Sequence, residues 1–591
     1  MEIRFKELGE ILVDELNEDG FWTGELSSSA LGVAVSVAAL HFHNSKENRK
    51  EIQRGLNWLK HNMNSDGSYG DTPESPGNIS TSLLVFAAIH LYSSNDEALQ
   101  QLETNIASYL MLSGIDIHSD KIADAILAHY KKVFTFSVPI LSMCALCGIP
   151  EKHAFRKIPQ LPFELALIPR SFYRLLNLSV VSYAIPALIA VGIVIFKKKK
   201  AGRLASWIRR GAEKKALHIL EKSMPESGGF LEAIPLTAFV ALSLVNAEQK
   251  SSKVVVKGIA FLKRTQRPDG GWPIDVDLST WVSTLSIKAL GSKKEEILSE
   301  AQQTKITDHL KSVQIKTVHP FNGTSPGGWG WTNYSGSVPD CDDTPGAILA
   351  LLSLDKPENV KTEIIHGAMW LLRLQNKDGG FPTFSRGWGK LPFDQSCADL
   401  TGHAFLASAT ILNIYNEEIP GSQKRQLQKS LFKALAYLQK HQRKNGSWSA
   451  LWFGNQHTPD HENPVYGTAR ILCYLNDALP YLDEKYNLFQ RAQSMIASGE
   501  RFLVDVQNSN GSWGGDKNVS GTIEETSLAI SALQKNEFGA LRDHGFVWLD
   551  HYFETHGLIP SPIGLYFASL WYDEKMYPLT AYLEALRRCI R

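Results

Sequence analysis

The chain alternates between two kinds of apolar segment. In the first kind, apolar residues recur at helical spacing among charged ones, as in GIAFLKRTQ at residues 258–266. In the second kind, apolar and small residues fill nearly every position, as in STWVSTLSIKAL at residues 279–290. The first pattern predicts an amphipathic helix and the second an apolar helix, so each pair predicts a helical hairpin.

A glycine-rich turn that ends in an aromatic residue separates the two helices of each pair. Glycine permits the tight turn that ends a helix, and an aromatic side chain can fill the gap between neighbouring hairpins. Clear copies lie at 66–70, 269–272, 326–330, 378–381, 445–448 and 510–514, and weaker ones at 19–22 and 227–230. Four copies have an upstream glutamine that can hydrogen-bond exposed helix ends: Gln266, Gln375, Gln439 and Gln507.

The spacing of these turns separates the repeat architectures. They recur at about 50 to 65 residues, whereas tetratricopeptide and ankyrin units repeat at about 33 or 34. One hairpin cannot bury its apolar faces alone, but a ring of hairpins can. The repeats therefore favour a closed α/α barrel, and they leave open an α-solenoid scaffold without catalytic activity.

The turns and their glutamines resemble the QW motifs of the squalene–hopene and oxidosqualene cyclases, and the resemblance covers nearly the whole chain. It implies an all-α fold of two α/α barrels, one of them inserted after the first helix of the other. We expect residues 1–20 and 276–591 to form the catalytic barrel and residues 21–275 to form the inserted barrel.

Three aspartates follow directly on one of the turns. Asp340, Asp342 and Asp343 precede the apolar run AILALLSL and so lie at a helix start, where capping accounts for one or two of them. Carboxylates this close oppose one another's ionisation, and an apolar surround raises their pKa further. One carboxyl can therefore stay protonated near neutral pH, as the protonation of an alkene requires.

The aspartate stretch resembles the DxDD(T) signature of class II terpenoid cyclases, which implies that Asp342 donates the proton with support from Asp340 and Asp343. The segment DLTGH, from Asp399 to His403, resembles the D-V-T-A-H segment of that family. There the histidine hydrogen-bonds the catalytic aspartate and sharpens its acidity. We assign this role to His403 and count Asp399 in the catalytic set, although a histidine on an apolar helix is more often a core residue.

A carbocation formed by protonation needs exclusion of water and faces of π-electron density along its path. Trp281 and Trp331 resemble cavity-lining residues of the family. Most aromatic residues of a helical protein fill its core, so further assignments are weaker. The remaining candidates for substrate binding are Phe384, Trp452, Tyr466, Tyr566 and Tyr572.

The inserted barrel departs from the pattern of the hopene-forming enzymes. Ile234 stands where they have glutamine, and the apolar runs at 27–40 and 79–91 carry no glutamate where those enzymes place polar residues. These polar groups order the water that ends the hopene reaction. We therefore expect a different end to the reaction, and both squalene-like triterpenes and prenylated meroterpenoids stay open as substrates.

Composition and one long apolar run bear on partners and location. Lys+Arg and Asp+Glu balance at 61 each, which argues against a nucleic-acid partner. Six scattered cysteines and a charged N-terminal stretch indicate a reducing, cytoplasmic compartment. The uncharged run at 175–196, followed by lysines at 197–200, resembles the family's nonpolar plateau. We expect monotopic attachment to the cytoplasmic side of a membrane, with the lysines at anionic headgroups.

Two related chemistries fit the motifs less well. Class I terpene synthases hold Mg²⁺ through DDxxD, but the Asp342–Asp343 pair continues with Thr-Pro-Gly. Protein prenyltransferase β subunits share the barrel and bind zinc, usually through Asp-x-Cys, whereas Asp394 and Cys397 lie further apart. A prenyltransferase-like subunit remains a rival. We expect no metal and no cofactor; the expected partners are a hydrophobic polyprenyl substrate and a membrane surface, and a homodimer stays open.

Overall fold

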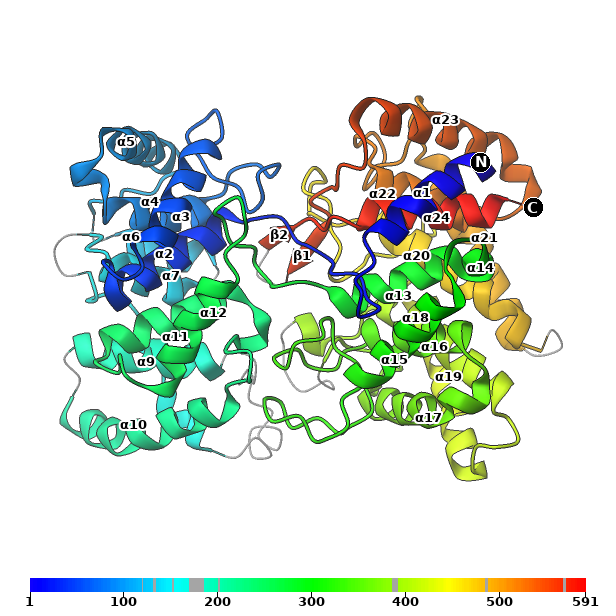
Figure 1. Cartoon of the computed structure of the whole chain (residues 1–591), viewed down its shortest axis with the longest axis horizontal. Helices are drawn as coiled ribbons and strands as arrows, with labels where there is room; N and C mark the ends of the chain where they lie inside the picture. Colours follow the sequence, from blue (N-terminus) through cyan, green and yellow to red (C-terminus); the bar gives the residue numbers. More distant parts are fainter. Residues whose placement is uncertain are drawn as a thin grey trace.

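The computed structural model describes residues 1–119, 121–130, 134–150, 154–168, 185–199, 202–384, 392–483, 487–566 and 570–590. The protein is mostly helical, as predicted, and its helices form two groups that lie side by side (Figure 1). Helices α2 to α12 form one group, and α1 (Glu2–Asp14) joins α13 to α24 in the other. The predicted domain boundaries at residues 20/21 and 275/276 remain predictions.

The larger group is a closed double ring of helices, as the α/α barrel prediction required. Each inner helix contacts the next, and the last contacts the first. The inner helices are α13 (Ser279–Leu290), α16 (Asp343–Leu354), α18 (Ala398–Ile414), α20 (Pro464–Ala478), α22 (Ile523–Ala532) and α24 (Tyr577–Cys589). Around them pack α1, α15 (Glu300–Val313), α17 (Pro357–Leu374), α19 (Gly421–His441), α21 (Asn487–Asp505) and α23 (Gly539–His556).

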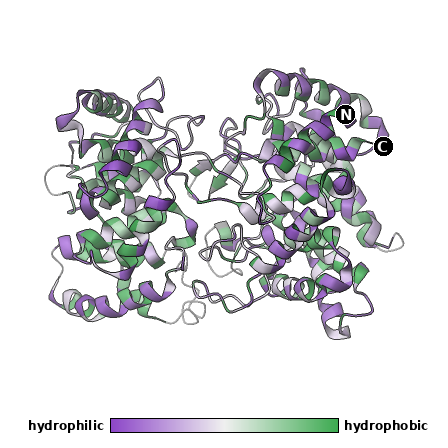
Figure 2. Ribbon diagram, in the orientation of Figure 1, coloured by the Kyte–Doolittle hydropathy of each residue, from purple (hydrophilic) through white to green (hydrophobic). Residues whose placement is uncertain are grey.

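The smaller group closes a ring in the same way among its described helices. The ring runs through α2 (Ala30–Asn44), α4 (Ile79–His90), α7 (Phe134–Leu146), α9 (Ile185–Lys198) and α11 (Ile234–Asn246). Outside it lie α3 (Arg49–His61), α5 (Glu97–Leu112), α6 (Ile122–His129), α10 (Arg203–Ser223) and α12 (Lys253–Arg264). Hydrophobic residues gather inside both groups and hydrophilic residues on their outer helices (Figure 2).

Short elements complete the described part of the chain. An antiparallel hairpin of β1 (Gly564–Tyr566) and β2 (Leu570–Tyr572), with Leu565 opposite Trp571, lies between the two barrels (Figure 1). A one-turn helix α14 (Lys294–Ile297) precedes α15. The 3₁₀ turns are η1 (Ser93–Asn95), η2 (Phe163–Leu167), η3 (Phe230–Glu232), η4 (Gly291–Lys293), η5 (Pro392–Asp394), η6 (Leu479–Tyr481) and η7 (Asn536–Phe538).

The apolar run at 175–196 differs from its prediction. Residues 175–184 lie outside the described residues, but 185–196 belong to α9, an inner helix buried nearly all round. Such a helix needs no polar face, so residues 185–196 are apolar because they fill the barrel, and membrane contact by residues 175–184 stays a prediction. Lys197 and Lys199 donate hydrogen bonds to the carbonyls of Ala247 and Ile158, so these two lysines are bonded within the barrel.

The repeated turns close each outer helix onto the following inner helix. In the turn of residues 445–448, Gly446 has a φ of +92°, which favours glycine. The buried indole of Trp448 donates to the carbonyl of Leu438, at 2.9 Å, and its backbone N–H donates to the hydroxyl of Thr468 on α20, at 3.0 Å. The turns at Trp22, Tyr69, Trp329 and Trp513 repeat this pair of bonds.

The glutamine of each turn was predicted correctly in three of four places. Gln266, Gln375 and Gln507 each donate to the carbonyl of the turn glycine and to a carbonyl of a neighbouring outer helix. The prediction for Gln439 was wrong, because Gln439 is exposed and accepts a hydrogen bond from Arg491. Gln442 fills the role, because the reach to the glycine carbonyl requires a spacing of four residues, as from Gln442 to Gly446.

We predict that Gln442→Ala destabilises the larger barrel. Gln442 donates at 2.9 Å both to Gly446 and to the carbonyl of Met495 on α21, so its loss leaves two partly buried acceptors unpaired. The free energy of unfolding should fall by about 1–3 kcal/mol in a urea titration. Gln439→Ala, on the same helix, is the matched control and should change it by less than about 0.5 kcal/mol. Equal losses in the two variants would contradict this role for Gln442.

Candidate active site

The three aspartates lie at the start of the inner helix α16, as predicted. The loop before it is fixed by backbone bonds from Asp340 to the carbonyl of Trp329 and from Cys341 to that of Thr383, both 2.9 Å long. The Asp340 carboxylate then accepts the backbone N–H groups of Asp342 and Asp343, at 2.9 and 2.8 Å. Asp340 is therefore the residue that caps the helix.

The three carboxyl groups have different surroundings. Asp340 and Asp343 are 3% and 2% exposed and are joined by a side-chain hydrogen bond. Asp342 caps nothing with its side chain and keeps part of its surface accessible, although protein surrounds it deeply enough to desolvate it. Asp342 is therefore the most accessible of the three aspartates and the one best placed to reach a bound molecule.

Burial raises the pKa of Asp342 well above its usual range, and the charges of Asp399 and Asp340 raise it further, while Arg470 lowers it. Burial also raises the pKa of Asp340 to about 7 and that of Asp343 well above its usual range, the latter with the help of Asp340. Burial and the neighbouring carboxylates therefore favour the protonated form of Asp342. The crowding of carboxyl groups and their desolvation both raise the pKa of Asp342, which is the predicted direction.

The predicted hydrogen bond between His403 and Asp342 is absent. His403 is buried on α18, and neither of its ring nitrogens has a hydrogen-bond partner. Its ring stacks on Tyr474 of α20, with centroids 4.5 Å apart, and a Cβ built on Gly346 would lie 3.5 Å from its Cε1. Gly346 is one turn beyond Asp342 on α16, so the ring lies beside this next turn and makes no hydrogen bond with the carboxyl.

Asp399 is brought to the same place as Asp342 by the start of α18. It is 5% exposed, and it accepts a hydrogen bond from the thiol of Cys397 at 2.6 Å. Burial raises its pKa above the usual range. Asp399 thus joins the carboxyl cluster as predicted, and it acts on Asp342 as the strongest of its neighbouring charges.

The predicted aromatic residues form two clusters. In the first, the ring of Phe384 lies 5.9 Å from Trp331, 6.1 Å from Trp452 and 5.8 Å from Phe393. The Trp331 carbonyl accepts backbone N–H groups from the start of α13, including that of Trp281 at 3.3 Å. Trp281 itself lies at the first turn of α13 with its ring 6.3 Å from His403, so it faces the same inner space.

The second cluster joins α20 to the hairpin. Phe453 stacks on Tyr466 at 4.2 Å and lies 5.9 Å from Tyr577, whose hydroxyl is 3.4 Å from that of Tyr572. The field of Asp342 reaches Tyr466 and Tyr572, so this cluster faces the acid. The side chain of Tyr566 lies outside the described residues.

Arg470 and Tyr474 belong to the site and were not predicted. Tyr466, Arg470 and Tyr474 follow one another at intervals of four residues on α20, which places all three on the face that looks into the barrel. An arginine within an otherwise apolar helix was the available signal, because a buried charge requires partners. Phe393, Phe453 and Tyr577 were missed because they lie in loops or at helix ends, where no periodicity marks them.

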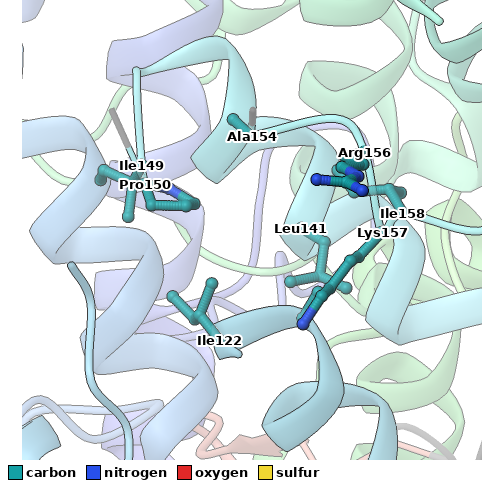
Figure 3. A pocket seen from close by; sticks show the side chains of 9 residues that line it. Ile122, Leu141, Ile149, Pro150, Ala154, Arg156, Lys157 and Ile158 are labelled. Atoms are coloured by element: carbon teal, nitrogen blue, oxygen red, sulfur yellow. The ribbon is translucent and has the colours of Figure 1, made fainter. Parts of the chain in front are cut away.

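Two hydrogen bonds tie the larger barrel to the smaller one beside the site. The hairpin N–H of Trp571 donates to Asp71 at 3.0 Å, and the loop N–H of Gly336 donates to Glu232 at 2.7 Å. The small pocket in Figure 3 is separate: it lies against α6 and α7, lined by Ile122, Leu141 and Ile149. Its volume of about 10 Å³ is room for about one water molecule, so it does not hold a polyprene.

A prenyltransferase-like site would need side chains gathered around a metal ion. Within the described residues, no group of three or more His, Cys, Asp or Glu side chains is placed to hold a metal ion. Cys397, one of the two residues weighed for zinc, donates its thiol hydrogen to Asp399. This hydrogen bond pairs the Cys397 thiol with the Asp399 carboxylate.

Comparison with known proteins agrees with this geometry. The models of the squalene–hopene cyclase N-terminal and C-terminal domains match residues 6–114 and 278–532. The fold matches ent-copalyl diphosphate synthase from Streptomyces platensis with a TM-score of 0.59 over 99% of both chains, at 16% identity. The fold and the acid site define a class II terpenoid cyclase. The chain belongs to the squalene–hopene cyclase family.

The relatives with curated names are distant. Enfumafungin synthase of Hormonema carpetanum is 23% identical over 94% of this chain, and the chain covers 45% of that protein. Squalene hopane cyclase of Aspergillus fumigatus is 23% identical over 85% of this chain and 76% of its own length. Sporulenol synthase of Bacillus subtilis is 32% identical over 27% of this chain and 24% of its own length.

A buried glutamate supports the loop that carries the second aromatic cluster. Glu525, at the start of α22, accepts hydrogen bonds from Asn455 at 2.8 Å and Asn463 at 2.7 Å. Both asparagines lie within the segment that joins Phe453 to Tyr466. Burial raises the pKa of Glu525 from 4.5 to about 7 despite these bonds.

We predict that Glu525→Gln flattens the dependence of stability on pH. Between pH 4.5 and about 7 the folded protein binds a proton at Glu525 that the unfolded chain has released. Its contribution to the free energy of unfolding is therefore lost as pH rises through about 7, and it amounts to about 3 kcal/mol. Urea titrations from about pH 5 to about pH 8 should show a smaller loss in Glu525→Gln than in wild type. Glu537→Gln, at an exposed site, should follow the wild type; an unchanged slope in Glu525→Gln would contradict the assignment.

Proposed function

We propose that this protein is a protonation-initiated terpenoid cyclase in which Asp342 is the general acid. The observation that carries the proposal is a partly accessible carboxyl group at the start of an inner helix, which makes no side-chain cap and whose surroundings favour its protonated form. In the first step the π electrons of an alkene take the Asp342 proton. A C–H bond forms, the O–H bond breaks, and a carbocation and the Asp342 carboxylate result.

Aromatic faces beside the acid suit the rest of the reaction. The clusters around Phe384 and Phe453 present several rings within 6.5 Å of one another, and such faces attract a cation. Buried apolar walls keep water from the intermediate until ring closure is complete. Loss of a proton or capture of water then ends the reaction and gives a polycyclic product.

We propose a linear polyprenyl substrate, either a squalene-like triterpene or a prenylated meroterpenoid. Support comes from the cyclase names of the relatives and from Ile234, a fully buried apolar residue at the start of α11. An isoleucine there cannot position water, so the substrate end that reaches the smaller barrel meets an apolar wall.

We also propose that the protein attaches to one leaflet of a membrane through α10, on its cytoplasmic side. Leu204, Trp207 and Ile208 are 72%, 75% and 45% exposed on this helix, and the exposed Arg203 and Arg210 flank them. Exposed aromatic and aliphatic side chains among basic ones suit an anionic bilayer surface. None of the helices in the described ranges is long and apolar enough to span a bilayer. A homodimer stays a prediction.

We predict that Asp342→Asn abolishes product formation. Detergent-solubilised protein is incubated with squalene, geranylgeraniol or a geranylated arene, and products are identified by mass spectrometry. Wild type should cyclise at least one of the three, and the variant should lose at least about 100-fold in rate, since asparagine offers no acidic proton. Asp355→Asn, at the other end of α16, is the control and should keep wild-type turnover. Cyclised product from Asp342→Asn at the wild-type rate would refute the mechanism.

We predict that the double variant Leu204→Ser/Trp207→Ser binds vesicles more weakly. In sedimentation with phosphatidylcholine–phosphatidylglycerol vesicles, its affinity should fall at least about tenfold, because each of these side chains contributes about 1.5–3 kcal/mol when buried. Val547→Ser, at an exposed position on α23, should bind like the wild type. Undiminished binding of the double variant would exclude α10 as the attachment site.

A further inference from the structure

Beyond Asp342, further along the inner helices, the larger barrel contains a set of buried charges. Glu584 of α24 is 3% exposed and lies 3.1 Å from Lys288 of α13, 2.9 Å from Arg588 and 3.6 Å from Arg470 of α20. Although burial alone opposes its ionisation, these three cations hold the pKa of Glu584 below its usual range. Asp477 also pairs with Arg588, at 2.5 Å, so two carboxylates face these three cations and positive charge is left uncompensated inside the barrel.

His403 does not add to that positive charge. Burial lowers its pKa well below the usual range, and the neighbouring Lys288 and Arg470 lower it further. The ring is neutral at pH 7 and makes no hydrogen bond, so its contact is the stack on Tyr474. A neutral, unbonded ring cannot stabilise a carboxylate by charge.

Arg470 is a cation whose charge lowers the pKa of Asp342, and contacts with its neighbour on α20 hold it in place. It is 7% exposed; its guanidinium lies over the ring of Tyr466 at 5.3 Å, and its Nε donates to the Tyr466 hydroxyl at 3.3 Å. Its Nη1 makes no hydrogen bond. Tyr466 and Tyr474, on either side of Arg470 along α20, both lie within the field of Asp342, so the face that carries Arg470 is turned toward the acid.

We propose that Arg470, and not His403, supplies the positive charge that stabilises the Asp342 carboxylate after its proton has left. The inference rests on the proposed function, since it concerns the conjugate base formed in the first step. Arg470 acts on the reaction through Asp342 and needs no contact with substrate. Because a guanidinium keeps its charge at every working pH, the support does not depend on the titration of a histidine.

The other groups around Asp342 do not supply this charge. From its own loop it faces Asp340, Asp343 and Cys341, which are acids or a buried thiol. The start of α18 contributes Asp399 and Cys397, and the hairpin contributes Tyr572. Lys288 acts on Glu584 and on His403.

The test measures the titration of Asp342 in the resting enzyme. The infrared carbonyl band of the protonated carboxyl is isolated as the difference between each protein and its Asp342→Asn counterpart, and is followed against pH. Arg470→Gln should move the midpoint to higher pH, and Arg470→Lys should return it toward wild type. Glu584→Gln should move it to lower pH, because it removes the counter-charge of Arg470. Lys288→Met and His403→Gln should leave it unchanged.

The rate of product formation gives a second readout. It is measured with the substrate that the wild type cyclises among squalene, geranylgeraniol and the geranylated arene. Arg470→Gln should lower the rate plateau by about 10- to 100-fold while its alkaline limb moves to higher pH, a combination that structural damage does not produce. An unmoved midpoint in Arg470→Gln, or equal shifts in His403→Gln, would overturn the inference. The infrared titration needs no substrate. If the wild type cyclised none of the three substrates, the result would count against the proposed function and not against the role of Arg470.

Discussion

The contact between α13 and α24 holds the architecture of the larger barrel together, because it closes the ring of inner helices. Closure removes the exposed apolar edge that an open solenoid would keep, and it surrounds an interior that water cannot reach from the side. The interior is where a carboxyl can be desolvated and a cation can survive. The helix starts that carry Asp342, Asp399 and Tyr466 are gathered around one opening by the same closure.

The repeats made the fold predictable. Most of the hairpins use the same glycine turn and the same aromatic plug, so the pattern of the sequence is also the pattern of many of the contacts. The prediction failed where one residue had to be chosen among several of its type. Gln439 has the right chemistry, but the reach of an amide across four residues selects Gln442. The run at 175–196 has the composition of a membrane segment, and its described half is instead an inner helix, since hydropathy does not distinguish lipid from the inside of a barrel.

For the acid site, too, the prediction from a local motif was right, and the role given to His403 on another helix was not. A local motif placed Asp340, Asp342 and Asp343 correctly, because their roles depend on one helix start. The role of His403 depended on where a ring from another helix falls along the barrel axis, and a position one turn away breaks the expected bond. Arg470 was overlooked because it lies in no motif. Its meaning appears only when charges from α13, α20 and α24 are brought together, which a linear sequence does not display.

The place of α1 has a consequence for the order of folding. This helix precedes the smaller barrel in the chain, yet it packs on α24, the last helix of the larger one. During synthesis α1 therefore emerges before the whole smaller barrel and waits for its partner, while the smaller barrel already has its described helices. The ring around Asp342 can close only when α24 has left the ribosome. Assembly of the acid site thus follows the synthesis of both barrels and is exposed to interruption throughout that time.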